Sequence, residues 1–323
     1  MGGDEVAGLK GATLVCCEEG LLLFGGSGGG FSDETYFLDL KKKVWRRLEG
    51  SKKPGRRAYH SVVVYDERMW IFGGLSGNSY RSDAWSLAIE EGKKTLDWRE
   101  ADAVGLKVRG REGHAAAVFE SNMVVFGGYD GVDFDDSLIC LNLETKIWWR
   151  PKESGSRPAA RAGHSLVASP VKEDDARRFF IMGGYDENGC LGNFGVASFV
   201  LKVREARVEW ETNTFFCGKA PAPRYGHVAC VVHHNIYVFG GHDGKRTYDD
   251  LHVLSFANPR KPTFRRRLFG GEVPAARHCH AAAVFHDDTL VIFGGAGPHR
   301  SNQRPHLFSD VALCVFPNSG DDT

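Results

Sequence analysis

A pair of adjacent glycines recurs six times along the 323-residue chain, each time directly after a short apolar run. The pairs are Gly25-Gly26, Gly73-Gly74, Gly127-Gly128, Gly183-Gly184, Gly240-Gly241 and Gly294-Gly295. The preceding runs, such as Met69-Trp70-Ile71-Phe72, contain the residue types that β-strands favour. Regular spacing of this kind indicates a repeat protein in which each repeat is one supersecondary unit.

A second pattern, Arg-x-x-His, precedes five of the six glycine pairs and opens another apolar run. It occurs at Arg57/His60, Arg111/His114, Arg161/His164, Arg224/His227 and Arg277/His280. The interval from the histidine to the first glycine is nearly constant, except in the repeat that a charged insertion around 169–178 lengthens. Leu9 and Ala12 stand at these positions in the first repeat.

Two further positions follow the glycines in each repeat. An acidic or amide residue introduces a third apolar run, at Asp83, Asp136, Asn193, Asp250 and Asp310. An aromatic residue opens a fourth run at a nearly constant interval before the next histidine, at Trp45, Trp98, Trp148, Trp210 and Phe264. Amphipathic helical periodicity is absent, so each repeat is predicted to hold four short strands separated by turns rich in Gly, Asp and Pro. Four strands in roughly 50 residues predict an all-β propeller blade.

These patterns resemble the kelch-repeat family, and the resemblance covers essentially the whole chain. It implies one six-bladed propeller over residues 1–323, of the kind found in the central domain of galactose oxidase, with four antiparallel strands per blade. The blades are predicted at approximately 9–52, 53–104, 105–155, 156–216, 217–270 and 271–317.

The repeated residues are expected to be structural. Glycine permits a positive φ and a close approach between blades. The aromatic residue is expected to pack between blades, and the histidines to form structural hydrogen bonds. A phosphate loop at 25–30 is disfavoured because no helix follows it. Equivalent histidines lie around an axis and form no metal cluster; His278 with His280, or His233-His234, are weak metal alternatives, so we expect neither metal nor cofactor.

Composition narrows the function classes. Lysine plus arginine equals aspartate plus glutamate, which argues against nucleic-acid binding, and we interpret the local Arg265-Arg266-Arg267 run as a solvated face. The eight cysteines form no CxxC pair, which favours a reducing, cytoplasmic location. The apolar runs are too short for a membrane-spanning helix and no secretory signal opens the chain, so no membrane association is expected.

Antiparallel strands place the loop that enters strand one and the loop that leaves strand two on the same face of the propeller. That face collects residues 27–34, 75–82, 129–135, 185–193, 242–248 and 296–309, with the repeat arginines expected at its rim or mouth. Tyr and Arg are favoured interface anchors, so this face is the predicted partner-binding site. Its candidate residues are Tyr80, Arg81, Tyr129, Asp130, Phe134, Tyr185, Asp186, His242, Asp243, Arg246, Tyr248, Arg300 and Arg304, and ordinary solvated loops are the alternative. Arg300 and Arg304, with His299 and His306 nearby, suggest an acidic or carboxylate-ended partner segment.

The sixth blade lacks a fourth strand in the sequence. The chain ends soon after Leu313-Cys314-Val315-Phe316, and only Asp4-Glu5-Val6 remain at the other end to help. A short blade, missing sequence and a strand added by a partner are the open alternatives.

The predicted function is a non-catalytic scaffold or adaptor that binds another protein or peptide through one propeller face. Narrower versions are a ubiquitin-ligase substrate receptor, although the BTB/BACK region or cullin-box tail usual for that role is absent from the sequence, and a cytoskeletal or ciliary scaffold. An enzyme is the remote alternative, because kelch-like propellers include a copper oxidase and iron-binding specifier proteins. No such metal set is assignable from the sequence, and neither oligomeric state nor partner identity follows from it.

Overall fold

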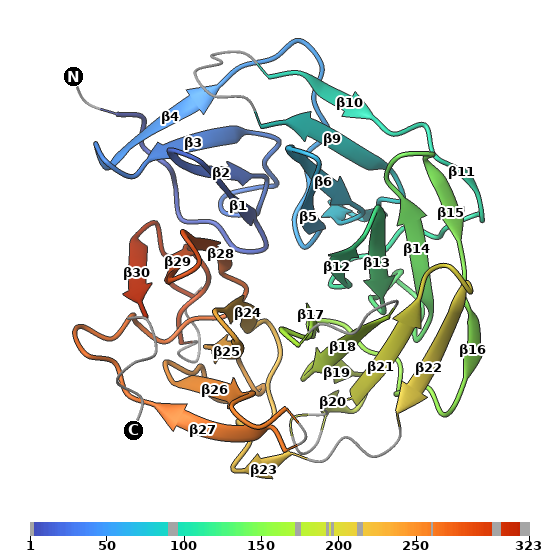
Figure 1. Cartoon of the computed structure of the whole chain (residues 1–323). Helices are drawn as coiled ribbons and strands as arrows, with labels where there is room; N and C mark the ends of the chain where they lie inside the picture. Colours follow the sequence, from blue (N-terminus) through green and yellow to red (C-terminus); the bar gives the residue numbers. More distant parts are fainter. Residues whose placement is uncertain are drawn as a thin grey trace.

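The computed structural model describes residues 3–89, 96–171, 176–191, 194, 197–211, 216–259, 261–298 and 305–316. Its strands form six main sheets that follow one another in chain order around a central axis (Figure 1). The strand nearest the axis is the first of the antiparallel strands in each sheet: β1, β5, β12, β17, β24 and β28. The last sheet stands beside the first, so the ring is closed. The predicted six-bladed propeller is therefore confirmed.

Each blade runs outward as an antiparallel meander. Blade 1 holds β1 (Thr13–Cys17), β2 (Gly20–Phe24), β3 (Thr35–Asp39) and β4 (Val44–Leu48), and blade 2 holds β5 (Ser61–Tyr65), β6 (Arg68–Phe72), β9 (Ala84–Ala88) and β10 (Trp98–Glu100). Blade 3 holds β12 (Ala115–Phe119), β13 (Asn122–Phe126), β14 (Leu138–Asn142) and β15 (Ile147–Trp149), and blade 4 holds β17 (Ser165–Ala168), β18 (Arg177–Met182), β21 (Ala197–Lys202) and β22 (Arg207–Glu211). Blade 5 holds β24 (Val228–Val232), β25 (Asn235–Phe239), β26 (Leu251–Ser255) and β27 (Thr263–Arg267), and blade 6 holds β28 (Ala281–Phe285), β29 (Thr289–Phe293) and β30 (Val311–Val315).

The segments that link one blade to the next add a short parallel strand outside the outermost strand. These are β11 (Val104–Gly105) on β15, β16 (Lys152–Ser154) on β22 and β23 (Cys217–Gly218) on β27. Two small hairpins, β7 (Leu75–Ser76) with β8 (Ser79–Tyr80) and β19 (Tyr185–Asp186) with β20 (Gly189–Cys190), stand in loops on one face.

The double glycine joins neighbouring blades. In blade 5, Gly240 and Gly241 have φ of 68° and 99°, which disfavour a residue with a Cβ. The Gly241 N–H donates to the carbonyl of Arg277 in blade 6 at 2.9 Å. The equivalent bond recurs around the ring, and Leu9 accepts the last one from Gly295 at 2.7 Å. The positive φ and the close approach predicted for the glycines are both present.

The repeat arginines, which we expected at the rim or mouth of the predicted partner-binding face, are buried, with exposed fractions of 0% to 4%. Arg57 donates to the carbonyl of Gly73 at 3.0 Å and forms a two-point ion pair with Asp83. The guanidinium therefore ties the end of the second strand to the start of the third within one blade.

Aspartates that introduce the third strand pair with the repeat arginine in other blades as well. Arg224 pairs with Asp250 and Arg277 with Asp310 in the same way, whereas Arg111 pairs with Asp135, the residue before Asp136. Asn193 lies outside the described residues.

The repeat histidines are buried, and three of them bond between blades. His60, His114 and His227 each place Nε2 at 2.8 to 3.0 Å from a hydroxyl that opens the first strand of the preceding blade. The hydroxyls belong to Thr13, Ser61 and Ser165. The equivalent residues for His164 and His280 are Ala115 and Val228, which offer no hydroxyl.

The aromatic residue of the fourth strand packs against the preceding blade, as predicted. Trp98 lies 4.9 Å from Phe24 and Trp148 lies 4.8 Å from Phe72, measured between ring centroids. Trp210 on Phe126, Phe264 on Phe194 and Trp45 on Phe293 repeat the contact. Because these rings are large and mostly buried, they contribute a few kcal/mol each by area.

Blade 6 is three-stranded in the described residues, as the sequence indicated. The N-terminal segment does not complete it. Instead, the Asp4 N–H donates to the carbonyl of Trp45 at 2.9 Å, along the outer edge of blade 1. All eight cysteines are free, and no helix among the described residues has the length and apolar character needed to cross a bilayer.

We predict that the second glycine of a pair is needed for space as well as for backbone conformation. Gly241 and Gly244 have similar φ of 99° and 94°, but a Cβ on Gly241 would lie 2.9 Å from the His227 Cβ, whereas one on Gly244 would meet nothing within 4 Å. Gly241→Ala should therefore lower the free energy of unfolding by about 1–3 kcal/mol more than Gly244→Ala, measured by urea denaturation. Equal losses would contradict the packing argument.

We also predict acid sensitivity from the buried histidines. Burial, together with the nearby arginine, lowers the pKa of His114 and of His227 to about 3 and also lowers those of His60, His164 and His280. Since the unfolded chain protonates first, stability is complete above about pH 6.5 and is lost as the pH falls below it. His227→Asn should reduce the slope of unfolding free energy below that pH by about 1.4 kcal/mol per pH unit. An unchanged slope in urea titrations between about pH 7.5 and 4.5 would count against a neutral buried imidazole.

Candidate functional site

The loops entering the first strand and leaving the second strand meet on one face. Isolated β-bridges join the residue after each repeat arginine to the residue after the glycine pair, as in Glu112 with Tyr129 and Tyr225 with His242. The arginine, the glycines and these bridges form a fixed frame beneath the loops. Side chains at the bridged positions are therefore held on rigid backbone near the axis.

A closed ring of six backbone hydrogen bonds encircles the axis on this face. The residue before each repeat histidine donates its N–H to the carbonyl of its equivalent in the preceding blade, at 2.6 to 3.0 Å. The ring residues are Gly11, Tyr59, Gly113, Gly163, Gly226 and Cys279, with φ between 53° and 65°. The left-handed conformation explains why four of the six are glycine.

Seven aromatic rings form a continuous series around the mouth of the axis, which we term the aromatic arc. Consecutive ring centroids lie 4.7 to 5.9 Å apart. The arc runs through Tyr80, Tyr129, Phe134, Tyr185, Tyr225, His242 and His278. These side chains come from blades 2 to 6 and are half-buried, so each ring is fixed by its neighbours while part of it remains accessible.

Tyr59 and Cys279 are the two residues of the hydrogen-bonded ring that carry side chains, and both lie inside the aromatic arc. A Cβ on Gly11 would lie 2.7 Å from the Tyr59 ring, and one on Gly226 would lie 2.9 Å from the Cys279 sulfur. Burial raises the pKa of Tyr59. Burial also raises the pKa of Cys279 to about 11, with the Lys10 charge opposing the rise and the Glu112 charge adding to it. Both groups are therefore protonated at neutral pH, and Cys279 is a poor nucleophile there.

Two charged residues of opposite sign stand at the mouth. Glu112 is in the bridged position of blade 3, and Lys10 is in that of blade 1. Burial raises the pKa of the Glu112 carboxyl, and the Lys10 charge opposes that rise. A bound chain that crosses the mouth would therefore meet an acid on one side and a base on the other.

The predicted binding residues divide into several groups. Tyr80, Tyr129, Phe134, Tyr185 and His242 lie in the arc. Asp130, Asp186 and Asp243 instead hold their own loops, because each accepts a hydrogen bond from a backbone N–H two residues on. These aspartates shape the loops that carry the rings.

The remaining predicted residues lie around the arc or outside the described residues. Tyr248 is buried, with its ring 4.1 Å from the Arg224 guanidinium and its hydroxyl donating to Asp243 at 2.6 Å. Arg246 is exposed above that ring, and Arg81 lies at the rim beside Gly55. Arg300 and Arg304 lie outside the described residues.

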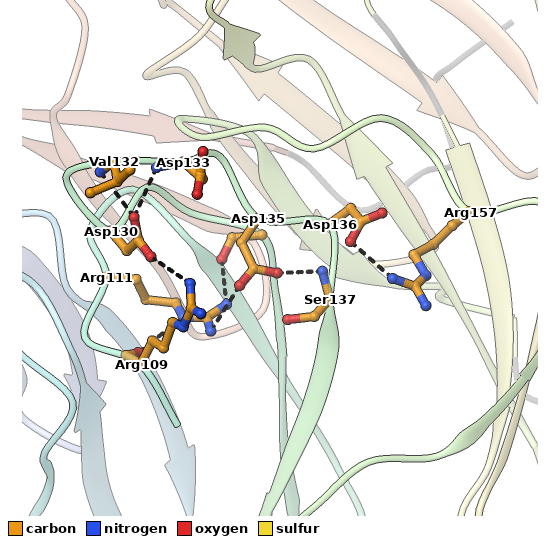
Figure 2. A network of polar contacts seen from close by, with 10 residues as sticks. Arg109, Arg111, Asp130, Val132, Asp133, Asp135, Asp136, Ser137 and Arg157 are labelled. Carbon is orange, nitrogen blue, oxygen red and sulfur yellow. Dashed lines mark hydrogen bonds and ion pairs between the residues drawn. The ribbon is translucent and has the colours of Figure 1, made fainter. Parts of the chain in front are cut away.

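A cleft of about 390 Å³ opens beside the arc in blade 3. Phe134 lines the cleft and also belongs to the arc. Figure 2 shows the charged network along its wall, in which Arg109 pairs with Asp130, Arg111 with Asp135 and Arg157 with Asp136. Lys107 and Arg150 are exposed in the same lining. The cleft therefore adds a groove lined by charged side chains beside the surface formed by the aromatic arc.

Sequence reasoning missed Tyr59, Glu112, Tyr225, His278 and Cys279. These residues occupy the two variable positions of the Arg-x-x-His pattern. Their variation within an otherwise fixed motif was the signal available in the sequence. Among the described residues, no group of three or more His, Cys, Asp or Glu side chains is arranged to hold a metal ion.

Comparisons with known proteins agree with the geometry. The chain is 26% identical over 284 residues to host cell factor 1 of Homo sapiens, a match that covers 76% of this chain and 13% of that protein. It is 28% identical over 319 residues to the leucine-zipper-like transcriptional regulator 1 homolog of Drosophila melanogaster, with 94% of this chain and 31% of that protein covered. The chain thus corresponds to a minor part of these relatives.

A solved structure of YjhT matches with a TM-score of 0.69 at 18% identity, covering 98% of each chain, which supports the fold alone. The KLHDC2/KLHL20/DRC7 kelch-repeats domain family matches residues 1–184 and, in a second match, 138–316. Because the matches to this family model cover most of the chain, the chain belongs to this kelch-repeat family.

Proposed function

We propose that this chain is a non-catalytic interaction module, acting as a scaffold or adaptor, that binds a segment of another protein along the aromatic arc. The arc itself carries the proposal, because it combines accessible aromatic rings with a rigid backbone. Aromatic side chains supply large contact area at little entropic cost. The ring of backbone hydrogen bonds beneath the arc already fixes the backbone there, so less conformational freedom would be lost on binding.

The charges around the arc favour a polypeptide over a small apolar ligand. Lys10 and Glu112 oppose one another at the mouth, and the blade 3 cleft adds paired arginines and aspartates. An extended segment with both apolar and charged side chains would match this mixture. The free cysteines support a reducing compartment such as the cytoplasm.

The two narrower roles differ in the kind of protein that carries the bound segment. A ubiquitin-ligase receptor would bring a degron-bearing protein to a ligase, whereas a cytoskeletal or ciliary scaffold would hold a filament component. Both would use the same face, so identifying the bound protein distinguishes them.

The test is a matched pair of tyrosine variants. Tyr185 contacts two neighbours within the arc, Phe134 at 5.5 Å and Tyr225 at 4.7 Å. Tyr65 ends β5 at the opposite face, beside the turn into β6. Tyr185→Ala should weaken partner binding at least about tenfold, or about 1.4 kcal/mol, while Tyr65→Ala should leave it unchanged.

The measurement is affinity purification of each tagged variant from native cells with quantitative mass spectrometry, followed by titration of the recovered partner. Melting temperatures of both variants check that the fold is intact. Recovery of the same partner by Tyr185→Ala and its loss from Tyr65→Ala would place binding on the opposite face and refute the proposal.

A further inference from the structure

Blade 6 differs from the other blades in how its linker meets the sheet. In each of blades 1 to 5, the preceding segment bonds to the outermost strand or its entry through the backbone. The bonds run from Asp4 to Trp45, Leu96 to Glu49, Leu106 to Trp148, Lys152 to Ala206 and Cys217 to Pro262, at 2.7 to 3.0 Å. Residues 268–276, which lead into blade 6, form no backbone–backbone hydrogen bond in the part of the chain that the structure describes. Among the described residues, the place of one strand therefore lies open between this linker and β30.

The outer edge of β30 is prepared for antiparallel pairing. Phe316 donates its N–H to Asp288 at 2.7 Å, and β30 pairs with β29 in continuous register. Because bonded and non-bonded pairs alternate in an antiparallel ladder, Val311, Leu313 and Val315 direct their N–H and C=O groups outward. These are the groups to which an added strand would bond.

Exposed apolar side chains concentrate at the same place. Leu313 and Val315 are 53% and 64% exposed on β30, and Leu268 and Val273 are 81% and 47% exposed in the linker. They make up half of the eight large hydrophobic side chains that are exposed among the described residues. No lysine or proline interrupts β30, although such residues commonly protect free edges.

The core of blade 6 is already covered, so the open place is a surface site and not an unfilled interior. Phe269 lies 6.0 Å from Phe239, in the position that the fourth-strand aromatic residue holds in other blades. Phe316 is 3% exposed and stacks on Tyr237 at 4.1 Å. An added strand is thus not required to supply a core side chain.

The two sides of the open place differ in chemistry. Val311 packs on the cluster shared with blade 1, so Leu313 and Val315 face the same side by strand alternation. On the side of blade 5, Arg267 lies 5.7 Å from the Phe316 ring, and the exposed Arg265 points the same way by alternation. A strand with apolar residues on one side and acidic residues on the other would match both sides. Glu272 is the exposed acid of the linker.

We propose that the open edge of blade 6 binds an extended segment of a partner protein, which pairs antiparallel to β30 and alternates apolar with acidic side chains. This surface is separate from the aromatic arc, so the two proposals can fail independently.

Two capped synthetic peptides test the inference, one alternating valine with glutamate and the other alternating valine with lysine. The valine–glutamate peptide should bind the full chain at least about tenfold more tightly, measured by fluorescence anisotropy with labelled peptide. Leu313→Pro removes one outward N–H without breaking a bond to β29 and should abolish binding. Leu313→Lys provides a second test if the proline variant unfolds, with Ile147→Lys on the complete blade 3 as control.

Three outcomes would overturn the proposal. Binding that persists in both Leu313 variants would place the peptide elsewhere, and no binding by either peptide at about millimolar concentration would show that the edge does not accept a strand. A concentration-dependent dimer that Leu313→Lys dissociates, measured by sedimentation, would assign the edge to a second copy of the chain. Tyr185→Ala should leave peptide binding unchanged.

Discussion

The ring of six backbone hydrogen bonds at the axis is the constraint on which the rest of the site depends. Each bond joins one blade to the next, and the sixth, from Gly11 to Cys279, closes the circle between the two ends of the chain. The left-handed residues of the ring also turn the chain so that the preceding residue enters a bridge with the loop after the glycine pair. The ring thus determines where the side chains at the mouth can stand.

Beneath this ring, the buried arginines and the double glycines supply the polar contacts that blades of different sequence share. Arg57 donates one hydrogen bond to the carbonyl of Gly73 and others to the Asp83 carboxylate. Its buried charge is therefore paired and hydrogen-bonded. Because these contacts involve mainly backbone and repeated side chains, the first residue between Arg and His is free to differ, whereas the second is held in the left-handed conformation. Blade 3 has Glu112 at the first such position, blade 5 has Tyr225 and blade 6 has His278. In the proposed function, recognition would therefore use side chains at positions where the frame fixes only the backbone.

The fold could be predicted from the sequence because its signals are local. The glycine pairs, the arginine–histidine spacing and the trailing aromatic residues each lie within one repeat, and each has one physical reason. The arc could not be predicted in the same way. Tyr185 meets Tyr225 from another blade, and the contact depends on the ring closing. The burial of the repeat arginines could not be predicted either, because spacing reveals the face of a residue but not its depth. In blade 3 the Gly127 N–H donates to Ser137, as the Gly73 N–H donates to Asp83, so a serine holds the equivalent position and the carboxylate comes from Asp135, two residues earlier.

The sixth blade shows that closure at the axis and completion at the rim are separate problems. At the axis, Gly295 donates to Leu9 and Cys279 accepts from Gly11, so blade 6 is joined to blade 1 by the same bonds as every other pair. At the rim, Phe269 and Phe316 cover the core that a fourth strand would otherwise cover. An outer strand can therefore be absent without opening the ring. For the same reason, a strand could bind and leave there while the aromatic arc on the face kept its geometry.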